Sequence, residues 1–129
     1  MNFMENESEQ KLRGGYYTPS DLACFLARWV RNINPANVLE PSCGDGIFFS
    51  ALSEAGLANR TAVTAFELDE AEAAKARKRA KTLRLNKAQV ESGDFLAWAI
   101  RNLGDKGQRF DAIVGNPPFV RYQYLPEPF

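Results

Sequence analysis

The chain has 129 residues, of which 45% are hydrophobic and 25% charged, and its 16 basic and 16 acidic side chains give a formal net charge of zero. This length and composition indicate a single globular domain and exclude disordered, collagen-like and disulfide-rich classes of protein. The absence of histidine excludes Ser-His-Asp triads, Cys-His pairs and His-containing zinc sites within the chain. The zero net charge is unlike that of a free-standing DNA-binding domain, which would normally show a basic excess.

The N-terminal residues are polar and show no apolar periodicity. We interpret 1–13 as a flexible arm ahead of one partial domain that spans 14–129. The arm lacks the apolar core of a signal peptide, and no apolar run reaches the ~20 residues that cross a bilayer. We therefore expect a cytoplasmic protein with no membrane partner, in which Cys24 and Cys43 remain thiols.

A helix is predicted to follow the turn at Gly14-Gly15. Thr18 would be its N-cap, Pro19 its first helical residue, and Asp21 would close a capping-box-like pattern. Apolar residues then recur at helical spacing as far as Asn34-Pro35, namely Leu22, Phe25, Leu26, Trp29 and Val30. We expect this apolar face to pack on the core.

From residue 37 onward, short apolar runs alternate with helical patterns, which predicts βαβ units and a parallel sheet. The expected strands are Val38–Leu39, Ala62–Phe66, Gln89–Glu91 and Ala112–Val114, and the expected helices are Phe48–Ala55, Glu70–Leu83 and Phe95–Leu103. The fold class is therefore α/β, a Rossmann-like sheet with flanking helices that stops after its fourth strand, whereas doubly wound sheets usually continue.

A glycine-containing turn, Glu40-Pro41-Ser42-Cys43-Gly44-Asp45-Gly46, follows the first predicted strand. Its glycines let the backbone approach a ligand, and Glu67 ends the second strand, where a carboxylate can accept both ribose hydroxyls of a nucleoside. Bulky side chains at 47–49 disfavour a dinucleotide, and Glu40 and Asp45 would repel a pyrophosphate but suit a cation. The pattern favours S-adenosylmethionine, with a tight turn bearing solvated acids as the alternative.

Asp94 and Phe95 follow the third predicted strand. Asp94 could accept a hydrogen bond from the exocyclic amine of a cofactor adenine, and Phe95 could offer the ring an apolar face. A plain helix N-cap is the alternative role for Asp94. The place of this segment in the order of strands favours the cofactor role.

The fourth predicted strand leads into Asn116-Pro117-Pro118-Phe119. An aromatic amine is a poor nucleophile because its lone pair is delocalised into the ring. The Asn116 side-chain oxygen and the Pro117 carbonyl could each accept one amine hydrogen, which would free that lone pair without a strong base. The prolines restrict the backbone, and Phe119 would stack on a base flipped out of a duplex; a strand-ending turn is the alternative.

Taken together, these segments resemble the gamma-class adenine-N6 DNA methyltransferases of bacterial restriction-modification and phage-defence systems. The likeness runs from Gly14 to Tyr122 in that family's motif order and includes Tyr17-Thr18-Pro19 before the cofactor turn and Val120-Arg121-Tyr122 at its end. It implies a cofactor site formed by Thr18, Glu40, Pro41, Cys43, Gly44, Gly46, Glu67, Leu68, Asp94 and Phe95. It also implies a catalytic target-amine site formed by Asn116, Pro117, Pro118 and Phe119.

The function implied by the resemblance is methyl transfer from S-adenosylmethionine to N6 of a flipped-out adenine in double-stranded DNA. The family's target-recognition region is missing, so the remainder of a methyltransferase or a specificity subunit is a candidate partner. Two alternatives stay open. One is an amino-methyltransferase that acts on rRNA guanine or protein glutamine, and the other is a non-catalytic fragment or half of a split enzyme.

Overall fold

The computed structural model describes residues 18–57, 59–102, 104 and 108–116, and these lie in one compact unit over 18–116. The expected arm over 1–13 and the residues 117–119 lie outside the described residues. In chain order the elements are α2 (Ser20–Asn32), β1 (Asn37–Glu40), α3 (Ile47–Glu54), β2 (Ala62–Glu67), α4 (Glu70–Thr82), β3 (Ala88–Ser92), α5 (Phe95–Arg101) and β4 (Ala112–Ile113). Every element expected within the described residues is present, with ends that differ by one or two residues.

The four strands form one parallel sheet in the order β3-β2-β1-β4. Glu40 at the end of β1 is in register with Ala65, and Glu67 at the end of β2 is in register with Ser92. The chain adds β2 and β3 on one side of β1 and then returns to place β4 on the other side. In open α/β sheets, ligands bind at the carboxyl ends of the strands where the strand order reverses in this way. The predicted α/β fold class is confirmed.

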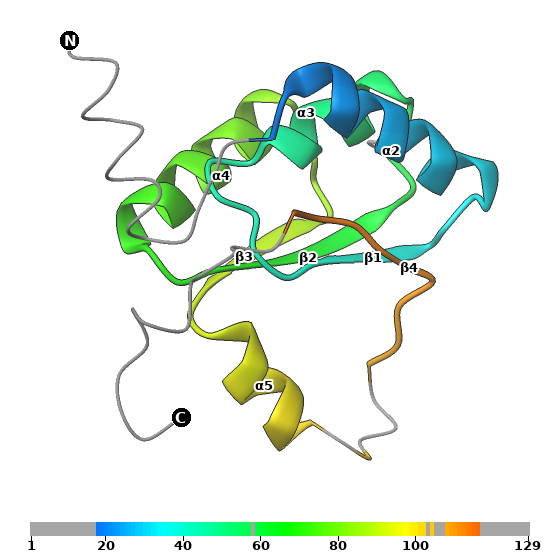
Figure 1. The fold of residues 1–129 in the computed structure, drawn as a ribbon. Coiled ribbons are helices and arrows are strands. Elements are labelled where there is room, and N and C mark those ends of the chain that lie inside the picture. Colours follow the sequence, from blue (N-terminus) through cyan, green and yellow to red (C-terminus); the bar gives the residue numbers. More distant parts are fainter. Residues whose placement is uncertain (1–17, 58, 103, 105–107, 117–129) are drawn as a thin grey trace, which may run out of the picture. The chain divides into compact units, whose positions relative to one another are not determined.

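Helices α2, α3 and α4 lie on one face of the sheet and α5 lies on the other (Figure 1). The main core fills the first of these interfaces, with Val38, Phe49 and Ala65 among its fully buried side chains. Helix α4 packs through the alanines Ala73, Ala76 and Ala80, whose small side chains let the helix approach the sheet and α3 closely.

The opposite face of the sheet is covered more thinly. Helix α5 contributes no buried residue among those described. It is attached by aromatic contacts, in which the Trp98 ring centroid lies 5.1 Å from that of Phe66 and 6.3 Å from that of Phe110. Phe95 also meets Phe66 edge-on, with centroids 5.5 Å apart, a geometry that aromatic rings prefer over face-to-face stacking.

The predicted buried face of α2 is correct for Val30, which is buried, and for Leu26, which packs against the core, but wrong for its other residues. Leu22, Phe25 and Trp29 are 46%, 49% and 67% exposed, and Ala23 and Ala27 are buried instead. Small side chains therefore form part of the buried face of α2. The larger apolar residues gave a stronger periodic signal than the alanines, although the alanines are the ones that the helix buries.

The predicted N-terminus of α2 is also wrong. The helix begins at Ser20, Pro19 occupies the N-cap position, and no side chain caps it. Thr18 is buried rather than capping, and the Asp21 carboxylate accepts the neighbouring Leu22 N–H at 2.9 Å.

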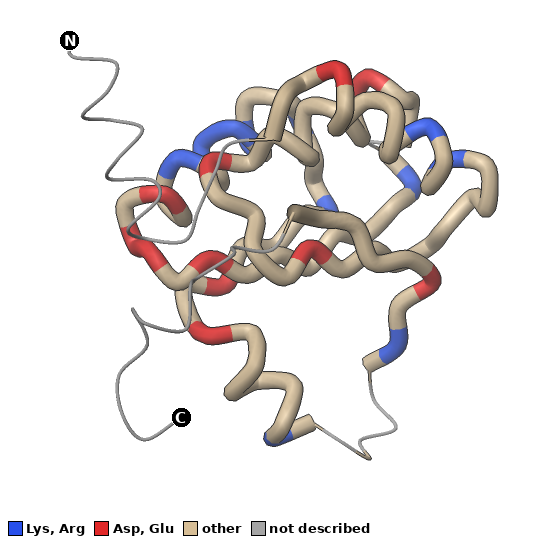
Figure 2. The backbone as a smooth tube through the Cα atoms, viewed as in Figure 1, with Lys and Arg blue, Asp and Glu red and all other residues tan. Residues whose placement is uncertain are grey.

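Helix α4 has its acidic residues in the first turn and its basic residues in the last, an order that complements the helix dipole (Figure 2). Its N-cap is Asp69, whose side chain accepts the N–H groups of Ala71 at 2.9 Å and Glu72 at 3.2 Å. Among the described helices, none is long and apolar enough to cross a membrane.

Candidate functional site

The parallel sheet brings the predicted site residues to one edge. Glu40 and Glu67 are the last residues of β1 and β2, Asp94 is the N-cap of α5 just after β3, and Asn116 follows β4. Because parallel strands share their direction, all four positions lie at the carboxyl edge of the sheet, where acidic residues gather (Figure 2). Residues that are up to 76 positions apart in the chain (116 − 40) therefore belong to one region of the surface.

The turn after β1 crosses the end of β2. The Cys43 N–H donates to the Phe66 carbonyl at 2.9 Å, and the Gly46 N–H donates to the Cys43 carbonyl at the same distance. Gly44 has a φ of +55°, a left-handed conformation that favours glycine, and a Cβ there would meet nothing within 4 Å. The turn thus presents an open backbone at Gly44, while Cys43 fixes it to the end of β2.

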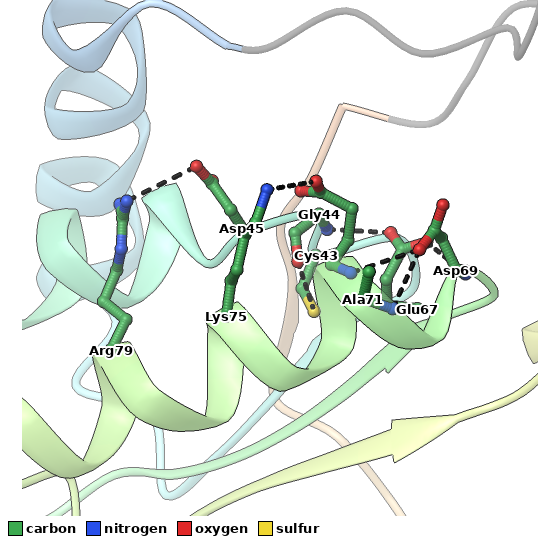
Figure 3. A network of polar contacts seen from close by, with 9 residues as sticks. Cys43, Gly44, Asp45, Glu67, Asp69, Ala71, Lys75 and Arg79 are labelled. Atoms are coloured by element: carbon green, nitrogen blue, oxygen red, sulfur yellow. Dashed lines mark hydrogen bonds and ion pairs between the residues drawn. The ribbon is translucent and has the colours of Figure 1, made fainter.

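Glu67 fastens this turn to the start of α4. One carboxylate oxygen accepts the Gly44 N–H at 2.9 Å and the other accepts the Asp69 N–H at 2.8 Å (Figure 3). Each carboxylate oxygen can accept two hydrogen bonds, so both keep a free acceptor position toward a ligand. The predicted ribose acceptor is therefore held in place by the backbone before any ligand binds.

Gly46 makes a close approach, but to the protein rather than to a ligand. Its φ is +94°, and a Cβ there would lie 3.1 Å from Phe49 Cδ2 and 3.3 Å from Ala76 Cα. This glycine therefore permits α3 to pack against α4. In dinucleotide-binding turns, a later glycine permits the close packing of the helix. Here Gly46 has that role, so the helix packs closely although residues 47–49 have bulky side chains.

Asp45 does not face a ligand as an unpaired charge. Its carboxylate lies 3.4 Å from Arg79 of α4, and both side chains are about a third exposed or less (Figure 3). The prediction that Asp45 would suit a cation is thus corrected: its charge is balanced by Arg79. Sequence reasoning missed Arg79, because nothing in the pattern of α4 separates it from the solvated bases around it.

Glu40 is the buried acid of the site, at 1% exposure. Its Oε1 accepts the Ser42 N–H at 2.9 Å, whereas its Oε2 has no hydrogen-bond partner among the described residues. Burial, with a contribution from nearby Glu67, raises the pKa of Glu40 from its ordinary value of 4.5 to about 8. Burial, with the charge of Glu40, likewise raises the pKa of the Cys43 thiol to about 12, so Cys43 is a buried thiol rather than a nucleophile.

The residues predicted to hold an adenine ring lie in a more open part of the edge. Asp94 is exposed and acts as the N-cap of α5, where its Oδ1 accepts the Leu96 N–H at 3.0 Å. Phe95 is half-buried against Phe66, and Leu68 is 75% exposed. The cap confirms the alternative role of Asp94 and leaves its second oxygen free of any hydrogen bond that the described residues show, so the two roles are compatible.

Asn116 is exposed at the end of the β4 segment, and Pro117, Pro118 and Phe119 lie outside the described residues. The preceding Gly115 is in close contact with Glu40: a Cβ on Gly115 would overlap the Glu40 carboxylate. The sequence pattern gave no signal for this contact, because it joins two strands that are separated by most of the domain.

The described residues fit a cationic nucleoside ligand. A buried carboxyl group with an orphan oxygen suits a positively charged group, the open backbone at Gly44 leaves space beside it, and Glu67 retains acceptor capacity toward hydroxyls. A pyrophosphate would meet two carboxyl groups and no free cation in the described part of the turn.

The fold is shared with solved methyltransferases. The chain superposes on a modification subunit of a putative type I restriction enzyme from Vibrio vulnificus with a TM-score of 0.67 and 23% identity, covering 96% of this chain and 29% of that one. An O-methyltransferase from Bacillus cereus in complex with SAH gives a TM-score of 0.65 and 24% identity, over 88% of this chain and 51% of that one. The fold class is therefore the Rossmann-like fold of methyltransferases.

The family is narrower than the fold. The model of the family described as N-6 DNA Methylase matches residues 2–127. The chain therefore belongs to the N-6 DNA methylase family, which confirms the resemblance on which the expected function rests.

Curated relatives place the chain beside type II methyltransferases. It is 29% identical over 114 residues to M.CvrRI of Paramecium bursaria Chlorella virus XZ-6E, covering 88% of this chain and 26% of the relative. It is 31% identical over 137 aligned residues to M.BanIII of Aneurinibacillus aneurinilyticus, covering 91% of this chain and 24% of the relative. The chain thus spans about a quarter of the length of these relatives.

Proposed function

We propose that this chain forms the cofactor-binding and target-amine part of an enzyme that transfers a methyl group from S-adenosylmethionine to N6 of adenine in DNA. The observation that carries the proposal is the gathering of Glu40, Glu67, Asp94 and Asn116 at one edge of a parallel sheet, in a chain of the N-6 DNA methylase family.

The turn and the neighbouring strand ends would hold the cofactor. Glu40 would face its cationic methionine part, within a pocket wall completed by Thr18, Pro41, Cys43 and Gly44, while Gly46 would hold the turn in place through its packing on α3 and α4. Glu67, beside Leu68, would accept from the ribose hydroxyls, and Asp94 with Phe95 would hold the adenine. The bound cofactor supplies an electrophilic methyl group on a sulfonium.

The chain's own contribution to the chemistry would lie at Asn116. Its side-chain oxygen, together with the Pro117 carbonyl, would accept the two hydrogens of the target amine and so localise the nitrogen lone pair. Pro118 would restrict the backbone there, and Phe119 would stack on the extruded base. This assignment needs no histidine, and the chain contains none.

The test has two stages on the full 129-residue chain. Equilibrium dialysis with labelled S-adenosylmethionine measures cofactor binding, which Glu67→Ala should weaken by roughly 100-fold and Glu91→Ala, at an exposed acid of β3, should leave intact. Transfer of the labelled methyl group to DNA is then measured, alone and with a polypeptide that spans the part of M.BanIII beyond the matched quarter.

The proposal predicts N6-methyladenine in digested DNA, and loss of that product in Asn116→Ala by roughly a hundredfold or more, the scale of removing one transition-state hydrogen bond. Product formed only with the added polypeptide would identify the chain as a part that needs its remainder or a partner subunit. Methyl label recovered in rRNA guanine or protein glutamine, and none in DNA, would overturn the DNA assignment.

A further inference from the structure

Glu40 and Gly115 join two parts of the site that the proposed function treats separately. Glu40 ends β1 and anchors the cofactor turn through the Ser42 N–H, at 2.9 Å. Gly115 leads from β4 directly into Asn116. The Glu40 carboxyl group fills the space in which any side chain at position 115 would stand.

The contact explains why position 115 is glycine. Its φ lies outside the left-handed range, so no backbone conformation requires the residue. The requirement is steric, because the carboxyl group of Glu40 lies against the Gly115 backbone with no room for a Cβ. The Glu40 carboxyl group and Gly115 are therefore in direct contact.

We propose that Glu40 is a positioning residue that couples the two halves of the site: the charge and placement of its carboxyl group set the position of Gly115, and through it that of Asn116. The role of this coupling in methyl transfer rests on the proposed function. The coupling between Glu40 and Gly115 itself requires neither cofactor nor DNA.

The unsatisfied oxygen of Glu40 supplies the physical basis. While the group is neutral, Oε1 accepts the Ser42 N–H, so the proton is carried by Oε2 and finds no acceptor among the described residues. A cation placed beside Oε2 would favour the carboxylate, with the proton released to solvent, and would attract Oε2 toward itself. The carboxyl group would then shift relative to Gly115.

The neighbouring groups do not neutralise Glu40. The turn contributes Cys43, whose thiol has a raised pKa, and Asp45, whose charge is paired with Arg79. The end of β2 contributes Glu67, a like charge. The described residues at the end of β4 contribute no titratable group. None of these described groups would balance an ionised Glu40, whereas a ligand cation would.

The coupling can be measured without cofactor or DNA. Magnetic resonance of the full chain, with isotope-labelled glycine amides and glutamate side-chain carboxyls, is recorded from about pH 6 to about pH 10. We expect one glutamate carboxyl to titrate with a midpoint near 8, and the Gly115 amide to titrate with the same midpoint. Gly56 and Gly93, which have open space around them, serve as internal references.

Two variants complete the test. Glu40→Gln keeps the shape of the neutral acid and should remove the Gly115 titration, whereas Glu54→Gln, at the exposed end of α3, should leave it unchanged. A Gly115 amide that does not follow the carboxyl midpoint in the unaltered chain, or that titrates unchanged in Glu40→Gln, would overturn the coupling. The first criterion holds even if the variant does not fold.

Added S-adenosylmethionine provides a third readout. It should move the Gly115 resonance in the same direction as raising the pH does, and Glu40→Gln should reduce that movement. A chain that shows the linked titration but no response to S-adenosylmethionine, either alone or with the added M.BanIII polypeptide, would refute the proposed cofactor and leave the coupling standing, so the two failures are distinguishable. If S-adenosylmethionine shifts other resonances of the chain but not that of Gly115, the coupling alone is refuted.

Discussion

The two halves of the carboxyl edge differ in how firmly the protein holds them. At the ends of β1 and β2, Glu40 is buried and Glu67 accepts two backbone N–H groups. At the ends of β3 and β4, Asp94 and Asn116 are exposed, and the hydrogen bond that Asp94 accepts from the Leu96 N–H serves its own helix.

The difference shows where the site is preorganised. The closed half, β1 with β2, holds its acceptors in place through backbone hydrogen bonds made by the domain itself, so ligand binding there need not order the protein. The open half, β3 with β4, leaves its polar groups to solvent. Substitutions in the closed half should therefore alter folding and binding together, whereas those in the open half should alter binding alone.

The largest expected effect is the pH dependence of stability that arises from Glu40. Its pKa is raised in the folded state, from 4.5 to about 8, so between these values the folded state holds a proton that the unfolded chain has lost. The free energy of unfolding should therefore fall as the pH rises through this window, on the order of 1 kcal/mol per pH unit. Denaturant unfolding at several pH values measures it.

Glu40→Gln isolates this contribution, because the neutral amide does not titrate. The difference in stability between the unaltered chain and Glu40→Gln should decline between about pH 5 and about pH 8 and level off at higher pH. If the free energies of unfolding of the two proteins depend on pH in the same way, Glu40 does not have a raised pKa in the folded state.

Glu67→Ala should have the next largest effect. It removes the acceptor of the Gly44 and Asp69 N–H groups as well as the proposed ribose acceptor. We expect binding of S-adenosylmethionine to weaken by roughly 100-fold, because hydrogen bonds to charged groups contribute about 1.5–3 kcal/mol each. Calorimetry measures binding, and thermal unfolding measures the accompanying loss of stability. An unchanged melting temperature would show that the hydrogen bonds of Glu67 to Gly44 and Asp69 do not stabilise the fold.

Gly46→Ala tests the packing that supports the closed half. A Cβ there would crowd Phe49 and the α4 backbone, and the φ of +94° is unfavourable for alanine. The matched variant Gly56→Ala has a φ of +87° but open space around its Cβ, so it reports the backbone term alone. We expect Gly46→Ala to be less stable than Gly56→Ala by about 1–3 kcal/mol in denaturant unfolding, and equal losses would refute the close approach.

The smallest effect is expected in the open half. Asparagine caps helices as well as aspartate does, so Asp94→Asn should preserve the stability of α5. It should weaken S-adenosylmethionine binding by about tenfold if Asp94 accepts the adenine amine, because the charged acceptor is lost. Asp69→Asn, the same change at the N-cap of α4, is the control and should leave binding within about twofold. Equal effects of the two variants would assign both acids to capping alone.

The sequence predicted the fold well because its signals were local. Alternation of short apolar runs with helical patterns located every strand and helix in the described region, and the turn after β1 was recognised from Gly44 and Gly46. The face of α2 was predicted correctly at Val30 but misjudged at the larger apolar residues, because periodicity records hydrophobicity, whereas the small side chains of Ala23 and Ala27 are the ones that the helix buries there.

By itself, the sequence determined the order of elements, the parallel sheet and the identity of the acids that follow its strands. Only the tertiary structure decided the charge state and the pairing of those acids: Arg79 of α4 pairs with Asp45, and burial raises the pKa of Glu40 to about 8. The reason is that ionisation and pairing depend on distances between elements and on exclusion of water, and neither is encoded in the spacing of residues along one strand or helix.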